Sequence, residues 1–455
     1  MSCSLLEQEI GRREWNESIW MSSWRIQPAR AVCGRWRPPP DKSISHRAAI
    51  LGLLAQGTTD IEHFLESDDC LRTLQMVQQL GAEVERMGEA RIRITGVGHQ
   101  PLREPSDVLD AGNSGTTARL MAGVLASAPV FSVLTGDESL RRRPMRRIVE
   151  PLQRMGAQID GRENASRLPL AIRGGDLRAI EYVTPVASAQ VKSCILLAGL
   201  RAAGTTEVIE PYLSRDHTER MLQVFGVELK IQMGDSDQHR VRLRGGQTLH
   251  ACSLTVPGDF SSAAFFIAAA LMLPSSDLTI EGVGVNPTRT GLLEALARAD
   301  VHLIWESLDE QGGEPVATLR VRAQPLRSMQ IGGSLIPRLI DEIPLLALLA
   351  TQATGETVIR DAAELRVKES DRIEAICTEL GKMGAQLECL PDGLRIQGPT
   401  PLHGAEVHSH GDHRVAMTLA IAGLVAQKGE TIIHEVDCVK TSFPDFEQAL
   451  ATLTK

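Results

Sequence analysis

The stretch Asn113–Asp137, "NSGTTARLMAGVLASAPVFSVLTGD", combines several structural signals in a fixed order. Small polar residues of the kind that cap helices come first, and a strongly apolar segment follows them. A small-residue turn then leads into a short β-prone segment. A helix that is apolar on almost every side is buried and does not lie at a surface. The stretch therefore predicts a buried helix followed by a strand.

The same pattern recurs along the chain. Further copies begin at Asp41, Ser188, Gly258, Ile340 and Gly411. Each copy is followed by a second segment, such as "TLQMVQQLGAEVER", in which apolar residues recur at i, i+3, i+4 and i+7 before an alternating strand. These copies recur roughly 70 to 80 residues apart, and internal repeats indicate a fold built from repeated supersecondary units. We predict an α/β fold of six β-α-β-α-β-β units, the last of them truncated.

Six units with internal helices and outer sheets predict two lobes of three units each. We expect one lobe to comprise residues 1–40 and 258–455 and the other residues 41–257. The stretches "RPPPDKS" and "TVPGDFSSA" would then be the two crossovers between lobes. Residues 1–20 are unlike the rest and are predicted to be a loosely held extension without recognisable chemistry.

Composition narrows the functional classes. The 455 residues carry a net charge of -9, which argues against a general nucleic-acid binder, so any anion site must be a local concentration of cations. No apolar run is long enough to span a bilayer, and the N-terminus has no apolar signal core. The eight cysteines form no CxxC pair, so we expect neither disulfides nor a cysteine-rich zinc site, and a cytoplasmic location.

Polar clusters occupy two recurring places, the start of each buried helix and the loop before each outer helix. The first group comprises Lys42, Ser43 and Arg47, Asn113–Thr116, Ser188 with Gln190, Asp341–Glu342, and Asp412–Arg414; the second comprises Arg143, Arg215, Lys368, Glu369, Arg372 and Lys440. Helix N-termini bind anions through free N–H groups and the helix dipole, and arginine adds bidentate contacts. Since equivalent positions of a quasi-symmetric fold face one place, the clusters predict a cleft for multiply charged anions.

Other interpretations of single motifs are weaker. Taken one at a time, each cluster is also explained as an ordinary helix cap or a solvated charge patch. "PPPDKS" lacks the upstream glycines of a P-loop, which argues against ATP binding there. His408, His410 and His413 have metal-like spacing, with the first two expected on a strand, but no cysteine or carboxylate pattern supports zinc. We therefore expect no metal and no cofactor.

The motifs taken together carry a resemblance. "DKSISHR", "GNSGTTAR", "RRRPM", "SAQVKS", "RDHTE", "NPTRTG", "RVKESDR", "GDHRVAM" and "KTSFPDF" occur in the order found in 5-enolpyruvylshikimate-3-phosphate synthases, and the chain resembles that family from about Ser22 to Phe446. The resemblance implies the inside-out α/β barrel pair. It also implies transfer of the enolpyruvyl group of phosphoenolpyruvate to the 5-hydroxyl of shikimate 3-phosphate, with release of phosphate. It further implies inhibition by glyphosate, and we expect a monomer.

The resemblance assigns roles to single residues. Asp341 would be the base at the 5-hydroxyl, Glu369 the acid that protonates the methylene carbon, and Lys42 a catalytic cation. Shikimate 3-phosphate would be bound by Lys42, Ser43, Arg47, Ser188, Ala189, Gln190, Arg215, Asp341 and Lys368. Phosphoenolpyruvate would be bound by Lys42, Gly115, Arg143, Gln190, Glu369, Arg372, Arg414 and Lys440.

One departure and two alternatives accompany this assignment. The family usually has Val-Pro-Gly before Asp-Lys-Ser, whereas this chain has Pro38-Pro39-Pro40. One alternative is the related transferase that acts on UDP-N-acetylglucosamine, which would show a reactive cysteine, whereas Cys70 and Cys194 lie in apolar surroundings. The other is a non-catalytic scaffold that binds anionic metabolites, which would not need Asp341 and Glu369 among the cations.

Overall fold

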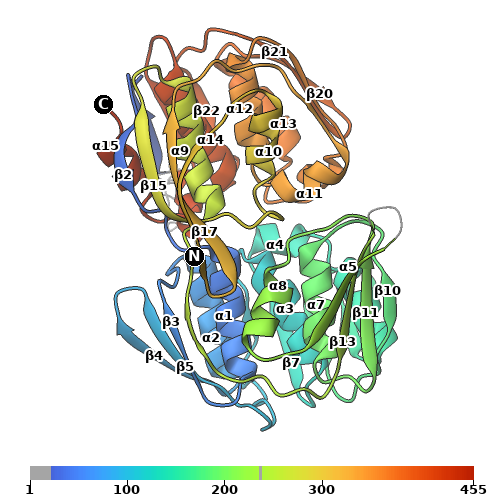
Figure 1. The fold of residues 1–455 in the computed structure, drawn as a ribbon. Coiled ribbons are helices and arrows are strands. Elements are labelled where there is room, and N and C mark those ends of the chain that lie inside the picture. Colours follow the sequence, from blue (N-terminus) through green and yellow to red (C-terminus); the bar gives the residue numbers. More distant parts are fainter. Residues whose placement is uncertain (1–21, 235–237) are drawn as a thin grey trace, which may run out of the picture.

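The computed structural model describes residues 22–234 and 238–455. Figure 1 shows two lobes, a lower lobe around helices α1, α3 and α7 and an upper lobe around α9, α12 and α14. The expected extension at residues 1–20 lies outside the described residues.

Sheets form the outer surface of both lobes. In the lower lobe the strand orders are β14(Ser253–Thr255)-β3(Thr58–Glu62)-β5(Arg91–Thr95)-β4(Glu83–Gly88), β6(Leu109–Asp110)-β7(Phe131–Thr135)-β9(Arg167–Arg173)-β8(Gln158–Gly161), and β10(Glu181–Val183)-β11(Thr205–Glu210)-β13(His239–Arg244)-β12(Leu229–Met233). In the upper lobe they are β16(Ile304–Gln311)-β17(Glu314–Arg322)-β15(Asp277–Gly284)-β2(Cys33–Trp36), β18(Gln330–Ile331)-β19(Gly355–Ile359)-β21(Gly393–Gly398)-β20(Gln386–Leu390), and β1(Ser23–Ile26)-β23(Thr431–His434)-β22(Glu406–His408).

The four-stranded sheets share one topology. Three consecutive neighbours are antiparallel, and a parallel strand completes one edge: β14 beside β3, β6 beside β7, β10 beside β11, β2 beside β15 and β18 beside β19. The first sheet of each lobe is completed by a strand that lies next to a crossover in sequence, because β14 is the last strand of the lower lobe and β2 directly precedes the first crossover. The crossovers are therefore held by strand pairing on both sides.

Helices fill each lobe. The buried helices are α1(Lys42–Leu54), α3(Gly115–Ala126), α7(Ala189–Gly199), α9(Phe260–Met272), α12(Ile343–Gln352) and α14(His413–Val425). The more amphipathic helices are α2(Asp68–Gln79), α5(Arg146–Met155), α8(His217–Val224), α10(Gly291–Arg298), α13(Arg372–Lys382) and α15(Phe446–Leu453). Shorter helical segments are α4(Glu138–Arg142), α6(Arg162–Ala165), α11(Ile336–Leu339), η2(Gly333–Leu335), η3(Ala363–Val367) and η4(Val436–Thr441).

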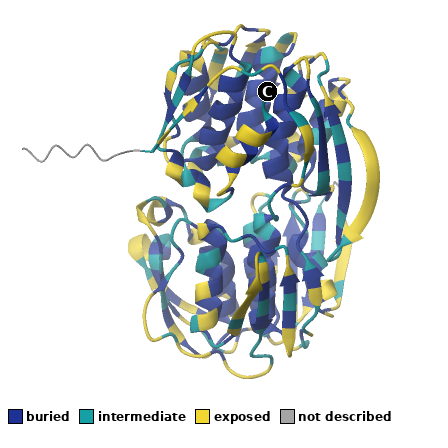
Figure 2. Ribbon diagram, turned by 90° about the vertical axis from the view of Figure 1, so that its left-hand side faces the viewer, coloured by how far each residue is buried: buried dark blue, intermediate teal, exposed yellow. Residues whose placement is uncertain are grey.

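Two separate apolar cores stabilise the two lobes. One contains buried side chains from Ile44 to Val256, and the other contains Ile26, Val32 and side chains from Phe260 to Leu453. Figure 2 shows the interior helices as buried and the exposed residues mainly on outer strands and loops. Polar side chains, not a shared apolar core, therefore line the boundary where the site lies. Within the described ranges, no helix is long and apolar enough to cross a bilayer.

Close packing of α3 on α7 sets the geometry of the lower lobe. A Cβ added to Gly123 of α3 would lie 2.3 Å from the carbonyl oxygen of Cys194 in α7, which leaves room only for glycine. The starts of these helices, at Gly115 and Ala189, consequently face the same cavity.

The crossover prolines lie beside the second crossover. The Asp41 N–H donates to the Pro257 carbonyl at 2.8 Å, and the Asp259 N–H donates to the Pro39 carbonyl at 2.7 Å. Pro40 and Gly258 form an isolated bridge between the same segments. The three consecutive prolines are thus accommodated in an extended segment that is hydrogen-bonded through its carbonyl groups.

Candidate active site

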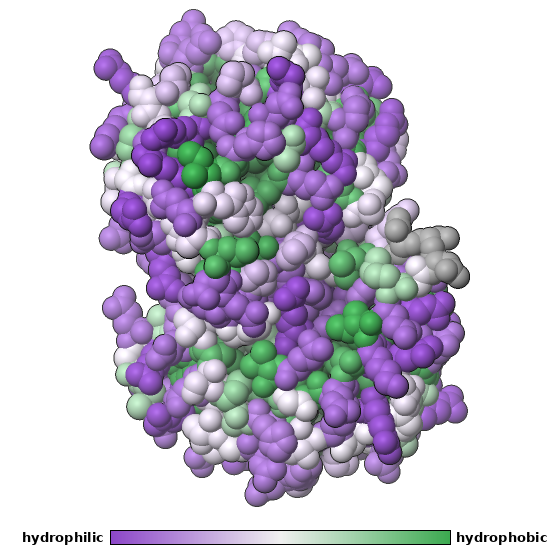
Figure 3. All heavy atoms as spheres, viewed as in Figure 1, coloured by the Kyte–Doolittle hydropathy of each residue, from purple (hydrophilic) through white to green (hydrophobic). Residues whose placement is uncertain are grey.

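A cavity of about 730 Å³ lies between the two lobes. Every predicted site residue except Lys440 lines it, and both lobes contribute. Figure 3 shows hydrophilic side chains gathered along the waist where the lobes meet. The site is therefore assembled from segments that are far apart in the sequence.

Helix starts supply much of the cavity wall. The Asp41 carboxylate caps α1 by accepting from the Ile44 N–H at 2.9 Å, so Lys42 and Ser43 lie in the first turn. Ser188 precedes α7, and its side chain makes no capping bond there, which leaves its hydroxyl free for a ligand. Free N–H groups and the positive end of the dipole make such helix starts suitable for phosphate and carboxylate groups.

Asp341 lies among cations from both lobes. Arg215 of the lower lobe approaches its Oδ2 to 2.5 Å, while Arg372 and Lys368 of the upper lobe lie 3.2 Å and 3.7 Å from its Oδ1. Burial alone would raise the pKa of Asp341, but these cations hold it well below its ordinary value. The carboxylate is therefore ionised at neutral pH and can accept a proton.

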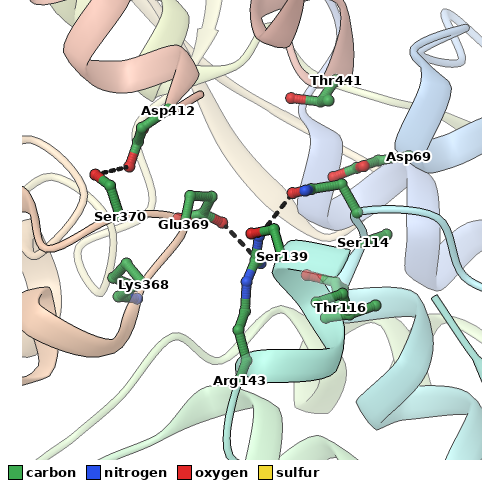
Figure 4. A network of polar contacts seen from close by, with 12 residues as sticks. Asp69, Ser114, Thr116, Ser139, Arg143, Lys368, Glu369, Ser370, Asp412 and Thr441 are labelled. Carbon is green, nitrogen blue, oxygen red and sulfur yellow. Dashed lines mark hydrogen bonds and ion pairs between the residues drawn. The ribbon is translucent and has the colours of Figure 1, made fainter. Parts of the chain in front are cut away.

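Glu369 is the second of the two carboxylates to which the sequence analysis assigned a catalytic role. Its Oε2 lies 2.6 Å from Arg372 Nη2, and its Oε1 lies 3.2 Å from Arg143 Nη1 of the lower lobe (Figure 4). Burial would raise the pKa of Glu369, but Arg372 and Arg143 outweigh burial and lower it well below its ordinary value. Asp412 fixes Arg372 in turn, with Nε 2.7 Å from Oδ2.

Lys42 and Arg47 are held on the α1 side. Lys42 Nζ lies 3.1 Å from Asp69 Oδ2, an acidic residue of α2 that the sequence analysis did not select. Arg47 donates from Nε to Thr218 Oγ1 at 2.7 Å and from Nη2 to Ser193 Oγ at 2.9 Å. Both cations are thus oriented before any ligand binds.

Arg119 is a cavity residue that the sequence analysis missed. It lies one helical turn after Gly115 in α3 and donates to Gln190 Oε1 at 2.6 Å. Burial, with Arg147 and Arg143 nearby, lowers the pKa of Arg119 to about 9. Its i+4 spacing from Gly115 was the available signal, because residues four apart share one face of a helix.

His413 also lines the cavity; it belongs to the predicted Asp412–Arg414 cluster, but the sequence analysis assigned it no ligand. Burial, followed by the charges of Lys42 and Arg414, lowers its pKa well below the ordinary value, so the imidazole is neutral. Conversely, Lys440 lies outside the cavity lining in η4, with its Nζ 2.9 Å from Asp437 Oδ1 and its side chain 64% exposed. Contact of Lys440 with a ligand in the cavity would require its side chain or this segment to move.

The histidines with metal-like spacing do not converge. His408 ends β22 and stacks on His434, His410 donates from Nε2 to Glu379 Oε1 at 2.8 Å, and His413 begins α14. The expectation that His410 belongs to the strand is wrong, because it adopts a positive φ of 56° after the strand has ended. A different group, Asp216, His217 and Glu314, lies close together, and Asn286 bridges its two carboxylates.

Fold and site together define an α/β protein with a cavity between two lobes, in which Asp341 and Glu369 lie among cations from both lobes. The sequence model for EPSP synthase (3-phosphoshikimate 1-carboxyvinyltransferase) matches residues 26–450. Because that match covers most of the chain, this protein belongs to the EPSP synthase family.

Known relatives agree over nearly the whole length. The chain is 55% identical over 430 residues to the 3-phosphoshikimate 1-carboxyvinyltransferase of Gloeobacter violaceus, covering 94% of this chain and 98% of the relative. It is 51% identical over 427 residues to that of Desulforamulus reducens, covering 93% and 98%. A solved EPSP synthase from Acinetobacter baumannii superposes with a TM-score of 0.83 at 42% identity, covering 95% and 98%.

Proposed function

We propose that this protein transfers the enolpyruvyl group of phosphoenolpyruvate to the 5-hydroxyl of shikimate 3-phosphate and releases phosphate. It is thereby a 3-phosphoshikimate 1-carboxyvinyltransferase of aromatic amino acid biosynthesis, as its relatives are named. The observation that carries the chemistry is the placement of Asp341 and Glu369 in one cavity among cations from both lobes. Binding anions alone would need the cations and not the carboxylates.

Shikimate 3-phosphate is assigned to the side of the cavity formed by α1, α7 and the loop before α8. Its phosphate and carboxylate can pair with free N–H groups and cations there. The proposed contacts are Lys42, Ser43, Arg47, Ser188, Ala189, Gln190, Arg215, Asp341 and Lys368.

Phosphoenolpyruvate is assigned to the side formed by the start of α3 and the upper lobe. The proposed contacts are Lys42, Gly115, Arg143, Gln190, Glu369, Arg372 and Arg414, with Lys440 joining after a movement of η4. The guanidinium groups can each bind a phosphate or carboxylate through two parallel N–H bonds.

Three proton transfers make up the proposed mechanism. Asp341 takes the proton of the attacking 5-hydroxyl, and Glu369 delivers a proton to the methylene carbon of phosphoenolpyruvate, which gives a tetrahedral intermediate. Glu369 then takes a proton back from the new methyl group while the C–O bond to phosphate breaks, so the double bond forms again and phosphate leaves with the proton held by Asp341. Protonation creates an oxocarbenium-like centre, which the neighbouring carboxylates stabilise electrostatically. Lys42 and Lys368 offset the negative charge of the tetrahedral intermediate. Closure of the lobes would exclude water from the reacting groups.

The finer description of the fold also belongs to this proposal. We infer six β-α-β-α-β-β units arranged as two inside-out barrels, with residues 1–40 and 258–455 in one domain and 41–257 in the other. The shared strand topology and the two separate apolar cores support this division. We further expect a monomer. The cysteines that the structure describes are free, which suits a reducing cytoplasm.

The alternative functions are less well supported. Cys70 and Cys194 are buried, and burial raises the pKa of both thiols, which is the opposite of what a reactive thiolate needs. The activity of the UDP-N-acetylglucosamine transferase is therefore not favoured. The placement of Asp341 and Glu369 among the cations argues against a passive scaffold.

A coupled assay tests the activity. Phosphate release should require both shikimate 3-phosphate and phosphoenolpyruvate, and each omission should abolish it. Release that needs UDP-N-acetylglucosamine in place of shikimate 3-phosphate would support the related transferase. Binding of both anions without release would support the scaffold.

A further inference from the structure

A lysine is fully buried beneath the shikimate 3-phosphate side of the cavity. Lys192 lies in the otherwise apolar helix α7, one turn after Ser188. Its Nζ is 2.8 Å from Glu210 Oε2 and 2.8 Å from Glu219 Oε1, and all three side chains are 0% exposed. Burial alone would lower the pKa of Lys192, but the two glutamates raise it above its ordinary value. The lysine is therefore a buried cation with two carboxylate partners.

Glu210 connects this lysine to the cavity wall. Its Oε1 accepts from the Ser188 N–H at 3.1 Å and from the Ser214 hydroxyl at 2.6 Å. Ser188 and Ser214 both line the cavity, whereas Glu210 and Lys192 do not. Lys192 Nζ also donates to the Ser214 carbonyl at 3.4 Å. One oxygen of Glu210 thus accepts hydrogen bonds from residues of the cavity wall, while the other pairs with the lysine.

Glu219 connects the same lysine to a third part of the site. It lies in the first turn of α8, next to Thr218, which accepts from Arg47 Nε at 2.7 Å. Ser193, next to Lys192, accepts from Arg47 Nη2 at 2.9 Å. The Lys192–Glu219 ion pair and the two hydrogen bonds of Arg47 therefore connect the first turns of α7 and α8.

We infer that Lys192 and Glu210 are positioning residues for the anion-binding start of α7 and for the Ser214 loop. Glu210 fixes the backbone of Ser188, so the Ser188 hydroxyl and the next N–H groups of α7 keep facing the cavity. Lys192 makes burial of the Glu210 carboxylate tolerable by pairing with it, since an unpaired buried carboxylate is strongly disfavoured. This inference rests on the proposed function, because it takes the ligand at α7 to be shikimate 3-phosphate.

Glu210→Gln is the most informative variant. An amide keeps the shape, but it presents a carbonyl on one side only and an NH₂ group on the other. It can therefore accept from Ser188 and Ser214, or face the Lys192 ammonium, but it cannot do both. Lys192 keeps Glu219 as its partner, so no buried charge is left alone. Glu207→Gln is the matched control, since Glu207 lies on the same strand β11 and pairs with Arg240 and Arg242 away from the cavity.

The test measures binding of shikimate 3-phosphate by calorimetry and the Michaelis constants of both substrates. For Glu210→Gln we expect the dissociation constant of shikimate 3-phosphate to rise about ten-fold, which is the scale of losing one hydrogen bond that orients the binding groups. The Michaelis constant of phosphoenolpyruvate at saturating shikimate 3-phosphate, and kcat, should stay within about two-fold. The control variant should change none of these quantities.

Two results would overturn the inference: unchanged binding of shikimate 3-phosphate, or a parallel loss of kcat and of affinity for both substrates. If the variant does not fold, a crystal structure of the unmodified protein with shikimate 3-phosphate decides. It should keep the Ser188 N–H on Glu210 and place the phosphate against Ser188 and Ser214; a phosphate bound elsewhere would refute the positioning role. An unmodified protein that is inactive with both substrates would instead refute the proposed function.

Discussion

At the scale of single residues, the carboxylates of Asp341 and Glu369 have the same charge but opposite proposed roles. Cations lower the pKa of both Asp341 and Glu369, so Asp341 is in the ionised form that a base requires, whereas Glu369 lacks the proton that an acid must deliver. Anionic phosphoenolpyruvate would pair with Arg143 and Arg372 and so weaken their effect on Glu369. Substrate binding should therefore raise the pKa of Glu369 and prepare it as an acid.

Replacing either carboxylate by its amide should slow turnover. Asp341→Asn and Glu369→Gln remove proton transfer, which is worth about 10²- to 10⁴-fold, while most anion contacts remain. Steady-state kinetics and calorimetry measure kcat and substrate affinity. Glu374→Gln, which replaces an exposed carboxylate on helix α13, is the control. Near-normal turnover of either cavity variant would refute the role assigned to that residue.

The same carboxylates should make stability depend on acidity. Because their folded pKa values lie well below the unfolded ones, their stabilisation is fully present above about pH 4.5 and is lost as the pH falls through the folded values. The unfolding free energy of Asp341→Asn should consequently fall less between pH 5 and pH 3 than that of the unmodified protein. Urea unfolding at a series of pH values measures this, and identical pH profiles would contradict the prediction.

Gly115→Ala should alter inhibition by glyphosate, to which we expect the unmodified protein to be sensitive. The added Cβ would lie 2.9 Å from Arg119 Nη1 and 3.5 Å from Arg143 Nη1, so side-chain ends must shift and the backbone need not. The methyl group narrows the space beside phosphoenolpyruvate and should exclude a longer ligand more strongly. The inhibition constant should rise far more than the Michaelis constant of phosphoenolpyruvate.

Gly175→Ala is the matched control for this variant, because a Cβ there meets nothing within 4 Å. Both constants should be unchanged in the control. Parallel increases of both constants in Gly115→Ala would show that this position does not discriminate between the ligands.

At the scale of elements, Asp41 stabilises helix α1 through a capping hydrogen bond but also places a charge in a buried position. Asp41 accepts from the Ile44 N–H, yet burial and the nearby Asp259 charge raise its pKa. A raised carboxyl pKa means that stability is lost as the pH rises from the unfolded value, about 3.9, through the folded one. Asparagine caps equally well without a charge.

Asp41→Asn should therefore gain stability relative to the unmodified protein as the pH rises from 4 to 7, whereas Asp41→Ala should lose about 0.5–2 kcal/mol through loss of the cap. Urea unfolding at both pH values measures these differences. Asp137→Asn, at the exposed cap of α4, serves as the control. A constant difference between Asp41→Asn and the unmodified protein would contradict the expected effect of burial.

At the scale of the whole molecule, ion pairs join the two lobes across the cavity. Arg143–Glu369, Arg147–Glu364 and Arg215–Asp341 each link a lower-lobe arginine to an upper-lobe carboxylate. Anionic substrates compete with these carboxylates for the same guanidinium groups. Substrate binding should thus replace ion pairs between the lobes by contacts between the ligand and both lobes.

Small-angle scattering tests this exchange. At 1 M salt, where the Debye length is about 3 Å, the radius of gyration of the protein without ligand should change little, because the Arg143–Glu369 and Arg215–Asp341 pairs are largely buried contact pairs. Saturation with shikimate 3-phosphate should give a smaller radius of gyration than the empty protein at the same salt concentration. An unchanged radius, with saturation verified, would argue against closure by the ligand.

Much of the fold and most of the candidate site were predictable from sequence because their signals are local. Helical periodicity, cap residues and repeated apolar segments each depend on a few neighbouring positions, and the buried helices are found where these signals place them. The ordered motifs also indicated the family, and all but one of the site residues predicted from them line the cavity.

Tertiary structure alone decided the contacts between distant segments. It pairs β2 with β15 and β14 with β3, brings Arg143 within 3.2 Å of Glu369, places Arg119 against Gln190 and leaves Lys440 outside the cavity. It also turns Lys192, which in sequence is only a charge in an apolar helix, into the partner of Glu210 and Glu219. Such contacts depend on how helices and lobes pack in three dimensions, and local periodicity carries no information about that packing.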